Sequence, residues 1–233
     1  MMSVRTFLAA LAAGAAACTA VAAAPAAGAE QPATAAPGMV IYQPTGSGTA
    51  RCTLGFAARN GRGDRLAVTA GHCGQPGAPV TDVYGRPVGR YVAAAGDDID
   101  AHRYGYAIIA LAPGVNATNH VTPTVAVDRP ATAAPGDAVC LFGTTTGVQC
   151  GTVTDPKAGI IKGFLSNHGD SGGPIIRPRD NALVGILVAH DNAVGETYYQ
   201  PLDALVRAAA ATPIGERLGP VVTYASAPES SRA

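Results

Sequence analysis

The sequence lacks tryptophan, contains few charged residues and has no surplus of charge of either sign. Aromatic residues make up 5% and charged residues 14% of its 233 residues, and 16 Lys and Arg face 16 Asp and Glu. Because no basic surplus is present to meet phosphate groups, composition gives no reason to expect nucleic-acid binding. The 48% of hydrophobic residues exclude a wholly disordered chain, and the length suits one domain with a substantial core.

Long amphipathic helices are also missing, whereas turn-forming residues are abundant, with 29 Gly and 18 Pro. Short apolar segments between clusters of Gly, Pro, Asp and Asn are typical of an all-β barrel or sandwich. One helix is expected over residues 202–211, just after Pro201. The expected strands cover residues 52–57, 65–69, 106–111, 138–142, 151–153 and 182–188.

The two ends of the chain do not have the pattern of a folded domain. Residues 1–29 combine Arg5, an uncharged Ala/Leu-rich run and small residues before Ala29, which predicts a secretory signal peptide cleaved after Ala29. A membrane anchor and a lipoprotein site at Cys18 are the alternatives, but the run is weakly apolar and no large aliphatic residue precedes Cys18. We expect residues 30–37 to form a flexible entry and residues 212–233 a loosely ordered tail.

Removal of the signal peptide leaves an even number of cysteines in an exported chain. Two disulfide bonds are the natural interpretation in an oxidising compartment, and three pairings are possible. A zinc site is the rival interpretation, but the sequence has no CxxC pair and only His72 adjoins a cysteine, so we expect no metal. The four cysteines are Cys52, Cys73, Cys140 and Cys150.

Two motifs point to chemistry: TAGHC at residues 69–73 and GDSGGP at residues 169–174. A serine between glycines can lie on a tight turn with an exposed hydroxyl, and nearby backbone N–H groups can converge to stabilise an anion. Such a hydroxyl needs a base within hydrogen-bond reach, and His72 is the obvious candidate for Ser171. Taken singly, each motif is equally well explained as a flexible turn or a structural polar residue.

Together and in this order, the two motifs resemble those of the chymotrypsin-like serine peptidases, especially the small bacterial branch that includes the streptogrisins. The segment 52–56 resembles the first cysteine strand of that family, and residues 139–152 resemble its second cysteine hairpin. The resemblance spans residues 38–211 and implies a peptidase domain of two six-stranded antiparallel β-barrels with a short C-terminal helix. It also implies the disulfide bonds Cys52–Cys73 and Cys140–Cys150.

The resemblance further assigns roles to individual residues of this sequence. Ser171 would be the nucleophile and His72 the general base, and the backbone N–H groups of Gly169 and Ser171 would form the oxyanion hole. Asp170 would be buried in an ion pair. The substrate would be a protein or peptide, and no cofactor is implied.

The sequence departs from the family where the third triad member is expected. An aspartate normally begins the run that is represented here by residues 105–109, but Gly105 occupies its place. Asp97, Asp98 and Asp100 lie just before it, and we take Asp100, the nearest, as the candidate. The alternative is that these acids form a solvated loop.

Two further positions differ from the family pattern. Leu141 replaces the arginine that pairs with the aspartate before the nucleophile, which leaves Arg177 and Arg179 as candidate partners for Asp170. The pocket-base position falls on Leu165, which argues against a preference for Lys or Arg side chains. His190 ends the strand that lines the pocket, where it narrows the pocket, binds a polar group or is an ordinary edge-strand residue.

These observations predict a secreted serine endopeptidase that is monomeric, binds no nucleic acid and does not insert stably into membranes. The intact histidine and serine motifs favour an active enzyme. Gly105 favours the alternative, a peptidase-fold protein with little turnover that acts as a binding module in the cell envelope.

Overall fold

The computed structural model describes residues 32–46 and 48–222, and this part of the chain is built mainly from β-strands. The first half contains β1 (Thr34–Ala35), β2 (Val40–Thr45), β3 (Gly48–Thr53), β4 (Phe56–Arg59), β5 (Arg65–Thr69), β6 (Pro79–Thr81), β7 (Pro87–Ala95), β8 (Tyr106–Leu111) and β9 (Asn116–Ala117). The second half contains β10 (Arg129–Pro130), β11 (Ala138–Gly143), β12 (Gly147–Asp155), β13 (Ile160–Lys162), β14 (Pro174–Arg177), β15 (Ala182–Asp191), β16 (Glu196–Pro201), the helix α1 (Leu202–Ala209) and β17 (Gly219–Pro220).

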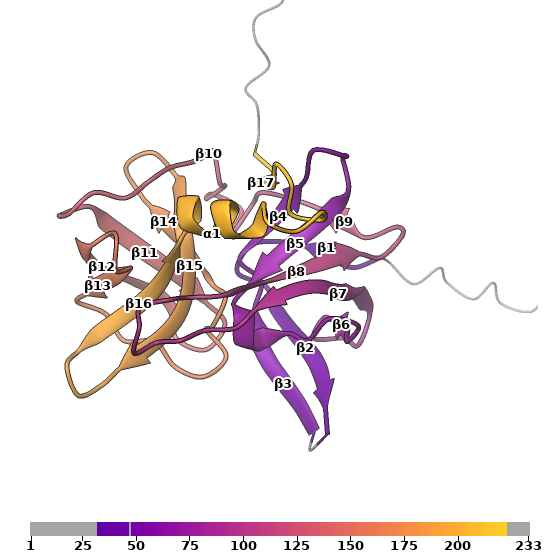
Figure 1. The fold of residues 1–233 in the computed structure, drawn as a ribbon, viewed down its shortest axis with the longest axis horizontal. Helices are drawn as coiled ribbons and strands as arrows, with labels where there is room; N and C mark the ends of the chain where they lie inside the picture. Colours follow the sequence, from indigo (N-terminus) through magenta and orange to yellow (C-terminus); the bar gives the residue numbers. More distant parts are fainter. Residues whose placement is uncertain (1–31, 47, 223–233) are drawn as a thin grey trace, which may run out of the picture. The chain divides into compact units, whose positions relative to one another are not determined.

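The strands form two large sheets, one from each half of the chain (Figure 1). The second sheet has the order β10-β15-β14-β11-β12-β13-β16, and pairing of β15 with β16 closes six of its strands into a barrel. The first sheet has the order β17-β4-β5-β8-β7-β6-β2-β3, and no ladder between described residues closes it. The predicted all-β, chymotrypsin-like fold is confirmed, with closure by strand pairing in the second barrel.

The predicted strands at residues 65–69 and 106–111 coincide with β5 and β8, but the one at 52–57 is divided between β3 and β4. The chain bends at Leu54 and Gly55 because another segment lies against it. The N–H of Thr53 donates to the carbonyl of Ser171 over 2.8 Å. A Cβ atom at Gly55 would lie only 2.7 Å from the carbonyl oxygen of Gly172. The break therefore places the start of the first sheet against the loop that carries Ser171.

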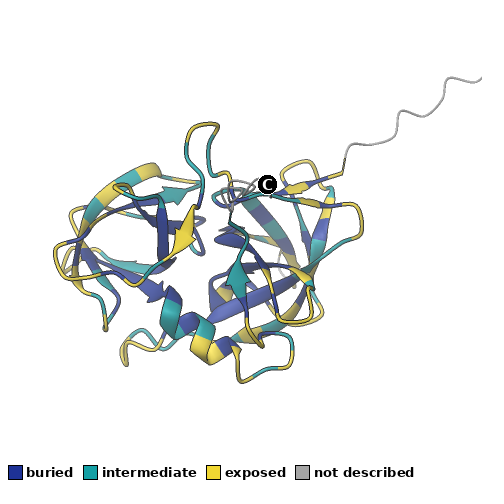
Figure 2. Cartoon of the chain, turned by 90° about the horizontal axis from the view of Figure 1, so that it is seen from above, coloured by how far each residue is buried: buried dark blue, intermediate teal, exposed yellow. Residues whose placement is uncertain are grey.

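Three large apolar clusters, beside a smaller fourth one, form the core, and Figure 2 shows long buried stretches in the strands of both sheets. The first contains Ile41 and Tyr91 of the first sheet, and the third contains Leu141 and Tyr199 of the second. The second cluster joins residues of both sheets to α1, which lies across their junction in Figure 1. This shared core fixes the position of one sheet relative to the other. The large side chains of this second cluster include Phe56, Leu66, Ile108, Ile186 and Leu205.

The segments expected to be flexible at the two ends of the domain are in part docked onto it. Ala33 and Ala35 are buried, and β1 pairs in parallel with β9. Leu218 is buried as well, and β17 pairs with β4. Small and apolar side chains at alternate positions give even these Pro-rich segments a face to bury. The expected signal peptide, residues 1–29, lies outside the described residues.

Candidate active site

His72 lies on a single 3₁₀ turn, Gly71–Cys73, that begins one residue after the end of β5. Cys73 is joined to Cys52 of β3 by a disulfide bond, which ties this turn to the neighbouring strand. A Cβ atom at Gly71 would overlap the carbonyl oxygen of Ala95, the last residue of β7. Glycine at position 71 therefore allows the histidine turn to approach the end of β7 closely.

The carboxylate that contacts His72 belongs to Asp97. Its Oδ2 lies 2.6 Å from Nδ1 of the imidazole and 3.3 Å from the backbone nitrogen of the same residue. The Asp97 side chain is only 8% exposed, whereas that of His72 is 46% exposed. Burial by itself would raise the pKa of the Asp97 carboxyl, but hydrogen bonds from the His72 ring and the Gly105 N–H outweigh it and lower this pKa. Asp97 is thus ionised at neutral pH.

The structure corrects the choice of Asp100 as the nearest carboxylate. Residues 98–103 form a tight turn in which the backbones of Asp98 and Arg103 exchange hydrogen bonds, and Asp100 is exposed on it. Asp98 forms an ion pair with Arg103. Proximity along the sequence is misleading here because β7 and β8 are antiparallel neighbours, with Ala95 opposite Tyr106. This register places Asp97 beside Gly105, where the family pattern has its aspartate.

Gly105 takes part in the site through its backbone. Its N–H donates to Oδ1 of Asp97, so the two carboxylate oxygens have separate partners. A Cβ atom at position 105 would overlap the carbonyl oxygen of Ala95. A residue with a side chain therefore does not fit at position 105. The carboxylate comes instead from Asp97, which follows the end of the neighbouring strand β7.

We expect Gly105→Ala to destabilise the protein by about 1–3 kcal/mol, because the new methyl group forces apart the ends of β7 and β8. Gly96→Ala is the matched control, since a Cβ atom at position 96 would meet no atom within 4 Å. Urea unfolding of the two variants measures the difference. Equal stability of both variants would contradict the close approach at Gly105.

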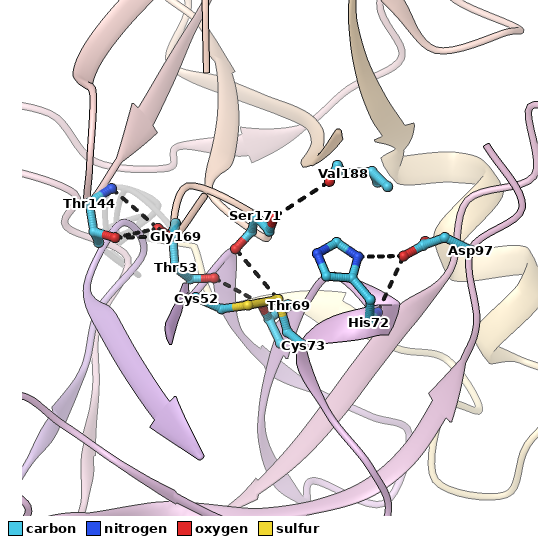
Figure 3. The surroundings of a disulfide bond; sticks show 10 residues. All are labelled: Cys52, Thr53, Thr69, His72, Cys73, Asp97, Thr144, Gly169, Ser171 and Val188. Atoms are coloured by element: carbon cyan, nitrogen blue, oxygen red, sulfur yellow. Dashed lines mark hydrogen bonds and ion pairs between the residues drawn. A yellow bond between two sulfur atoms is a disulfide. The ribbon is translucent and has the colours of Figure 1, made fainter. Parts of the chain in front are cut away.

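Ser171 lies on the loop between β13 and β14 of the second sheet. It faces the 3₁₀ turn of His72, which follows β5 of the first sheet. In Figure 3 the His72 ring lies between the Asp97 carboxylate and the side of Ser171. The Ser171 hydroxyl donates a long hydrogen bond of 3.5 Å to the carbonyl of Val188. Within the described residues, no hydrogen bond joins this hydroxyl to the His72 ring. Such contacts often shorten only when substrate binds.

The backbone N–H groups of Gly169 and Ser171 are available to a ligand. Neither donates a hydrogen bond to any group in the described part of the chain, although the intervening N–H of Asp170 donates to the carbonyl of Asn167. Gly169 has a φ angle of +99°, a conformation that favours glycine. One free donor belongs to Ser171 itself and the other lies two residues before it, so both are near the Ser171 hydroxyl, where an oxyanion hole is required.

Asp170 is fully buried, at 0% exposure, but it has no cationic partner among the described residues. Its two carboxylate oxygens accept hydrogen bonds from three backbone N–H groups and one hydroxyl. The expected ion pair is therefore replaced by neutral donors. Arg177 and Arg179, the candidate partners, form ion pairs with Asp137 instead.

A cavity of about 460 Å³ adjoins His72 and Ser171. Leu165, at the predicted pocket-base position, is 61% exposed and does not line this cavity, whereas Ser166 and Asn167 do. The predicted pocket-lining residue His190 is also present in its wall. The ring nitrogens of His190 lie 3.0 Å from the Thr197 hydroxyl and 3.0 Å from the Asn192 side-chain oxygen, which fixes the ring.

The cysteines are paired as the resemblance implies, in the bonds Cys52–Cys73 and Cys140–Cys150. Cys52, His72 and Cys73 are close enough together to suggest a metal site. Because thiolates are the metal-binding form of cysteine and these two sulfur atoms are oxidised, this group is a poor metal site.

No protein-family model matches the chain. Its similar proteins include an uncharacterized protein of Mycobacterium tuberculosis (Rv1815), 36% identical over 165 residues, which cover 64% of this chain and 71% of that protein. Streptogrisin-C of Streptomyces griseus is 33% identical over 197 residues, which cover 77% of this chain but only 42% of Streptogrisin-C.

Solved structures of bacterial proteases share the fold. A chymotrypsin of Cellulomonas bogoriensis matches with a TM-score of 0.61 and 27% identity, covering 82% of this chain and 100% of that one. A Nocardiopsis protease matches with a TM-score of 0.58 and 27% identity, covering 76% and 96% of the two chains. With its fold and its paired histidine and serine motifs, the chain belongs to the chymotrypsin-like serine peptidases, in their bacterial, streptogrisin-like branch.

Proposed function

We propose that the protein is a secreted serine endopeptidase that hydrolyses peptide bonds through an acyl-enzyme intermediate on Ser171. The observation that carries this proposal is the His72 imidazole held by Asp97 on one side and facing Ser171 on the other. An ionised carboxylate on Nδ1 leaves Nε2 of the neutral ring free to accept a proton. This is the arrangement that a serine nucleophile needs.

In the proposed reaction, the Ser171 oxygen attacks the scissile carbonyl carbon while Nε2 of His72 takes the hydroxyl proton. The carbonyl oxygen becomes an oxyanion, which accepts hydrogen bonds from the N–H groups of Gly169 and Ser171. His72 then gives its proton to the leaving amine, and the ester on Ser171 remains. A water molecule, deprotonated by the same imidazole, hydrolyses this ester and restores the hydroxyl.

Asp97 stabilises the imidazolium that forms in both steps and keeps Nδ1 protonated. It can do so because the Gly105 N–H and the His72 backbone fix its carboxylate. The positive charge that develops on the ring lies next to a buried anion, where the attraction is stronger than in water. The carboxylate therefore acts by orientation and charge and stays ionised itself.

The cavity beside Ser171 favours a neutral residue before the cleaved bond. Its polar wall consists of hydroxyl, amide and imidazole groups, and its one carboxylate, that of Asp97, is already bound to His72. A Lys or Arg side chain would find no free anion there, so burying its charge would be costly. A small or apolar side chain is the better fit, with a protein or peptide as the substrate.

Export of the protein is supported by its sequence pattern and its chemistry. Residues 1–29 have the pattern of a secretory signal peptide. Two disulfide bonds in a small domain are typical of an oxidising compartment. No helix in the described residues is long and apolar enough to span a membrane. We propose an extracellular or cell-envelope location for a monomeric enzyme.

A fluorophosphonate probe and a casein substrate test the proposed function directly. The Ser171 oxygen would form a bond to phosphorus as fluoride and the hydroxyl proton leave as HF, so the oxidised wild-type protein should gain the mass of the probe less HF and should cleave casein. Ser171→Ala should do neither. A folded wild-type protein that takes up no label and cleaves nothing would overturn the proposal and leave the alternative of a binding module.

A further inference from the structure

Three consecutive threonines, Thr144, Thr145 and Thr146, form the tip of the β11–β12 hairpin. The disulfide bond Cys140–Cys150 joins directly opposed residues of this hairpin. Each of the three hydroxyls donates to a different group of the loop that precedes Ser171. The accepting groups are the carbonyl of Gly169 for Thr144, the carbonyl of His168 for Thr145 and the carboxylate of Asp170 for Thr146.

The bond from Thr145 fixes the orientation of one oxyanion-hole donor. Its hydroxyl lies 2.8 Å from the carbonyl oxygen of His168. The carbonyl of His168 and the N–H of Gly169 belong to the same peptide group, and in a trans peptide they point in opposite directions. A carbonyl held toward Thr145 therefore keeps the Gly169 N–H directed away from the hairpin, where it is free to bind an oxyanion.

The next peptide group is held in the same way. The carbonyl oxygen of Gly169 accepts hydrogen bonds from the Thr144 hydroxyl over 3.0 Å and the Thr53 hydroxyl over 2.8 Å. Thr53 is fully buried and follows Cys52 of the first disulfide bond. Carbonyl groups on both sides of Gly169 thus have fixed partners, and a rotation of either peptide would break at least one of these bonds.

Asp170 anchors the loop from its other side. Its Oδ1 accepts the N–H groups of Thr145 (2.7 Å) and Thr146 (3.1 Å), and its Oδ2 accepts the Thr146 hydroxyl (2.8 Å) and the N–H of Asn167 (2.9 Å). Hydrogen bonds to a charged acceptor are the stronger kind. Gly143 permits this approach, because a Cβ atom there would overlap Oδ1.

We propose that the threonine triplet 144–146 is the positioning device of the oxyanion hole, and that it replaces the cation that would otherwise neutralise Asp170. This inference rests on the proposed function, since the hole matters only for an oxyanion at Ser171. Thr145 is the sharpest member to test, because it is exposed and its hydroxyl contacts the one carbonyl that sets the Gly169 N–H. Its hydroxyl touches no reacting atom and acts through that peptide group alone, whereas its backbone N–H, which donates to Asp170, is kept in a side-chain variant.

Thr145→Val keeps the shape of the side chain and the backbone N–H but removes the hydroxyl. We expect kcat for a peptide ester to fall about tenfold to a hundredfold, below the 10²–10³ that loss of a whole oxyanion-hole donor costs. KM should change less than about threefold, because substrate binding does not use the hole in the ground state. Affinity for a peptide boronate, which mimics the tetrahedral intermediate, should fall in parallel with kcat/KM. Thr145→Ser should restore all three values.

Thr154→Val is the matched control, since this exposed threonine of β12 donates to the carbonyl of Ile160 in β13 and not to a group of the loop that carries Ser171. It should leave kcat, KM and boronate affinity unchanged. Unchanged kcat and boronate affinity in Thr145→Val, or a loss that Thr145→Ser fails to reverse, would overturn the proposal.

Crystal structures of Thr145→Val and Thr145→Ser separate this inference from the proposed function. We expect the His168–Gly169 peptide to be rotated or poorly ordered in the valine variant and unchanged in the serine variant. An unchanged peptide in both would overturn the positioning role, whether or not the wild-type protein is active. A wild-type protein without activity would contradict the proposed function, while the two crystal structures would still decide the role of Thr145.

Discussion

Replacement of Asp97 by asparagine is expected to lower kcat by about 10⁴-fold with little change in the fold, as amide replacement of the triad carboxylate does in chymotrypsin-like enzymes. An asparagine can present its side-chain N–H groups to Nδ1 of His72, which would favour the tautomer that carries its proton on Nε2. That nitrogen then no longer accepts the proton of Ser171. The Gly105 N–H still has an oxygen to bind, so the local structure is kept. Steady-state hydrolysis of a peptide ester measures the loss.

Asp100→Asn is the matched control, because Asp100 is exposed on the 98–103 turn and Asp97 holds the imidazole. It should retain wild-type kcat. The reverse result, with activity lost in Asp100→Asn and kept in Asp97→Asn, would show that the loop rearranges before catalysis. Unfolding of both variants in urea checks that a loss of activity is not a loss of fold.

The sequence was sufficient to predict the nucleophile candidate, the base candidate and the fold class, because each depends on a local motif. TAGHC and GDSGGP lie on short turns whose form is set by their own glycines, as the close approach of Gly71 to Ala95 illustrates. The carboxylate was not predictable in this way. Asp97 reaches His72 because Ala95 pairs with Tyr106 across two antiparallel strands, and such a register cannot be counted along the chain.

The partner of Asp170 was beyond sequence reasoning for a related reason. An expected ion pair directs attention to cations, and Arg177 and Arg179 were candidates because they lie close to Asp170 in sequence. A buried carboxylate can instead be stabilised by several neutral donors that converge on it. Three of the four donors here are backbone N–H groups, which every residue but proline carries and which therefore leave no compositional signal.

Arg177 is held instead in a buried network that should contribute to the stability of the second sheet. Its guanidinium side chain, 7% exposed, lies 2.8 Å from Asp137 and 2.9 Å from Asp180. Asp137 is also buried. Arg177→Met removes the buried cation and leaves Asp137 and Asp180 paired only with the exposed side chains of Arg179 and Arg129, so we expect a loss of about 3–5 kcal/mol in the free energy of unfolding at pH 7. Urea unfolding measures it.

Arg179→Met is the matched control for Arg177→Met, because both arginines contact Asp137 at 2.8 Å, but the Arg179 side chain is 65% exposed. An exposed pair contributes about 0–1 kcal/mol, so this variant should be nearly as stable as the wild type. Equal losses in the two variants would show that burial does not set the strength of the network.

The pH dependence of the stability lost in Arg177→Met supplies an independent check. Burial tends to raise the pKa of Asp137, but the Ala134 N–H and Arg177 outweigh it, and hydrogen bonds from Arg177 hold the pKa of Asp180 far below its usual range. The unfolded chain thus takes up protons at a higher pH than the folded chain does. The stabilisation is complete above the ordinary Asp pKa of about 3.9 and is lost as pH falls through the lowered values. The penalty of Arg177→Met should therefore shrink between pH 7 and about pH 3, whereas a loss of packing alone would leave it constant.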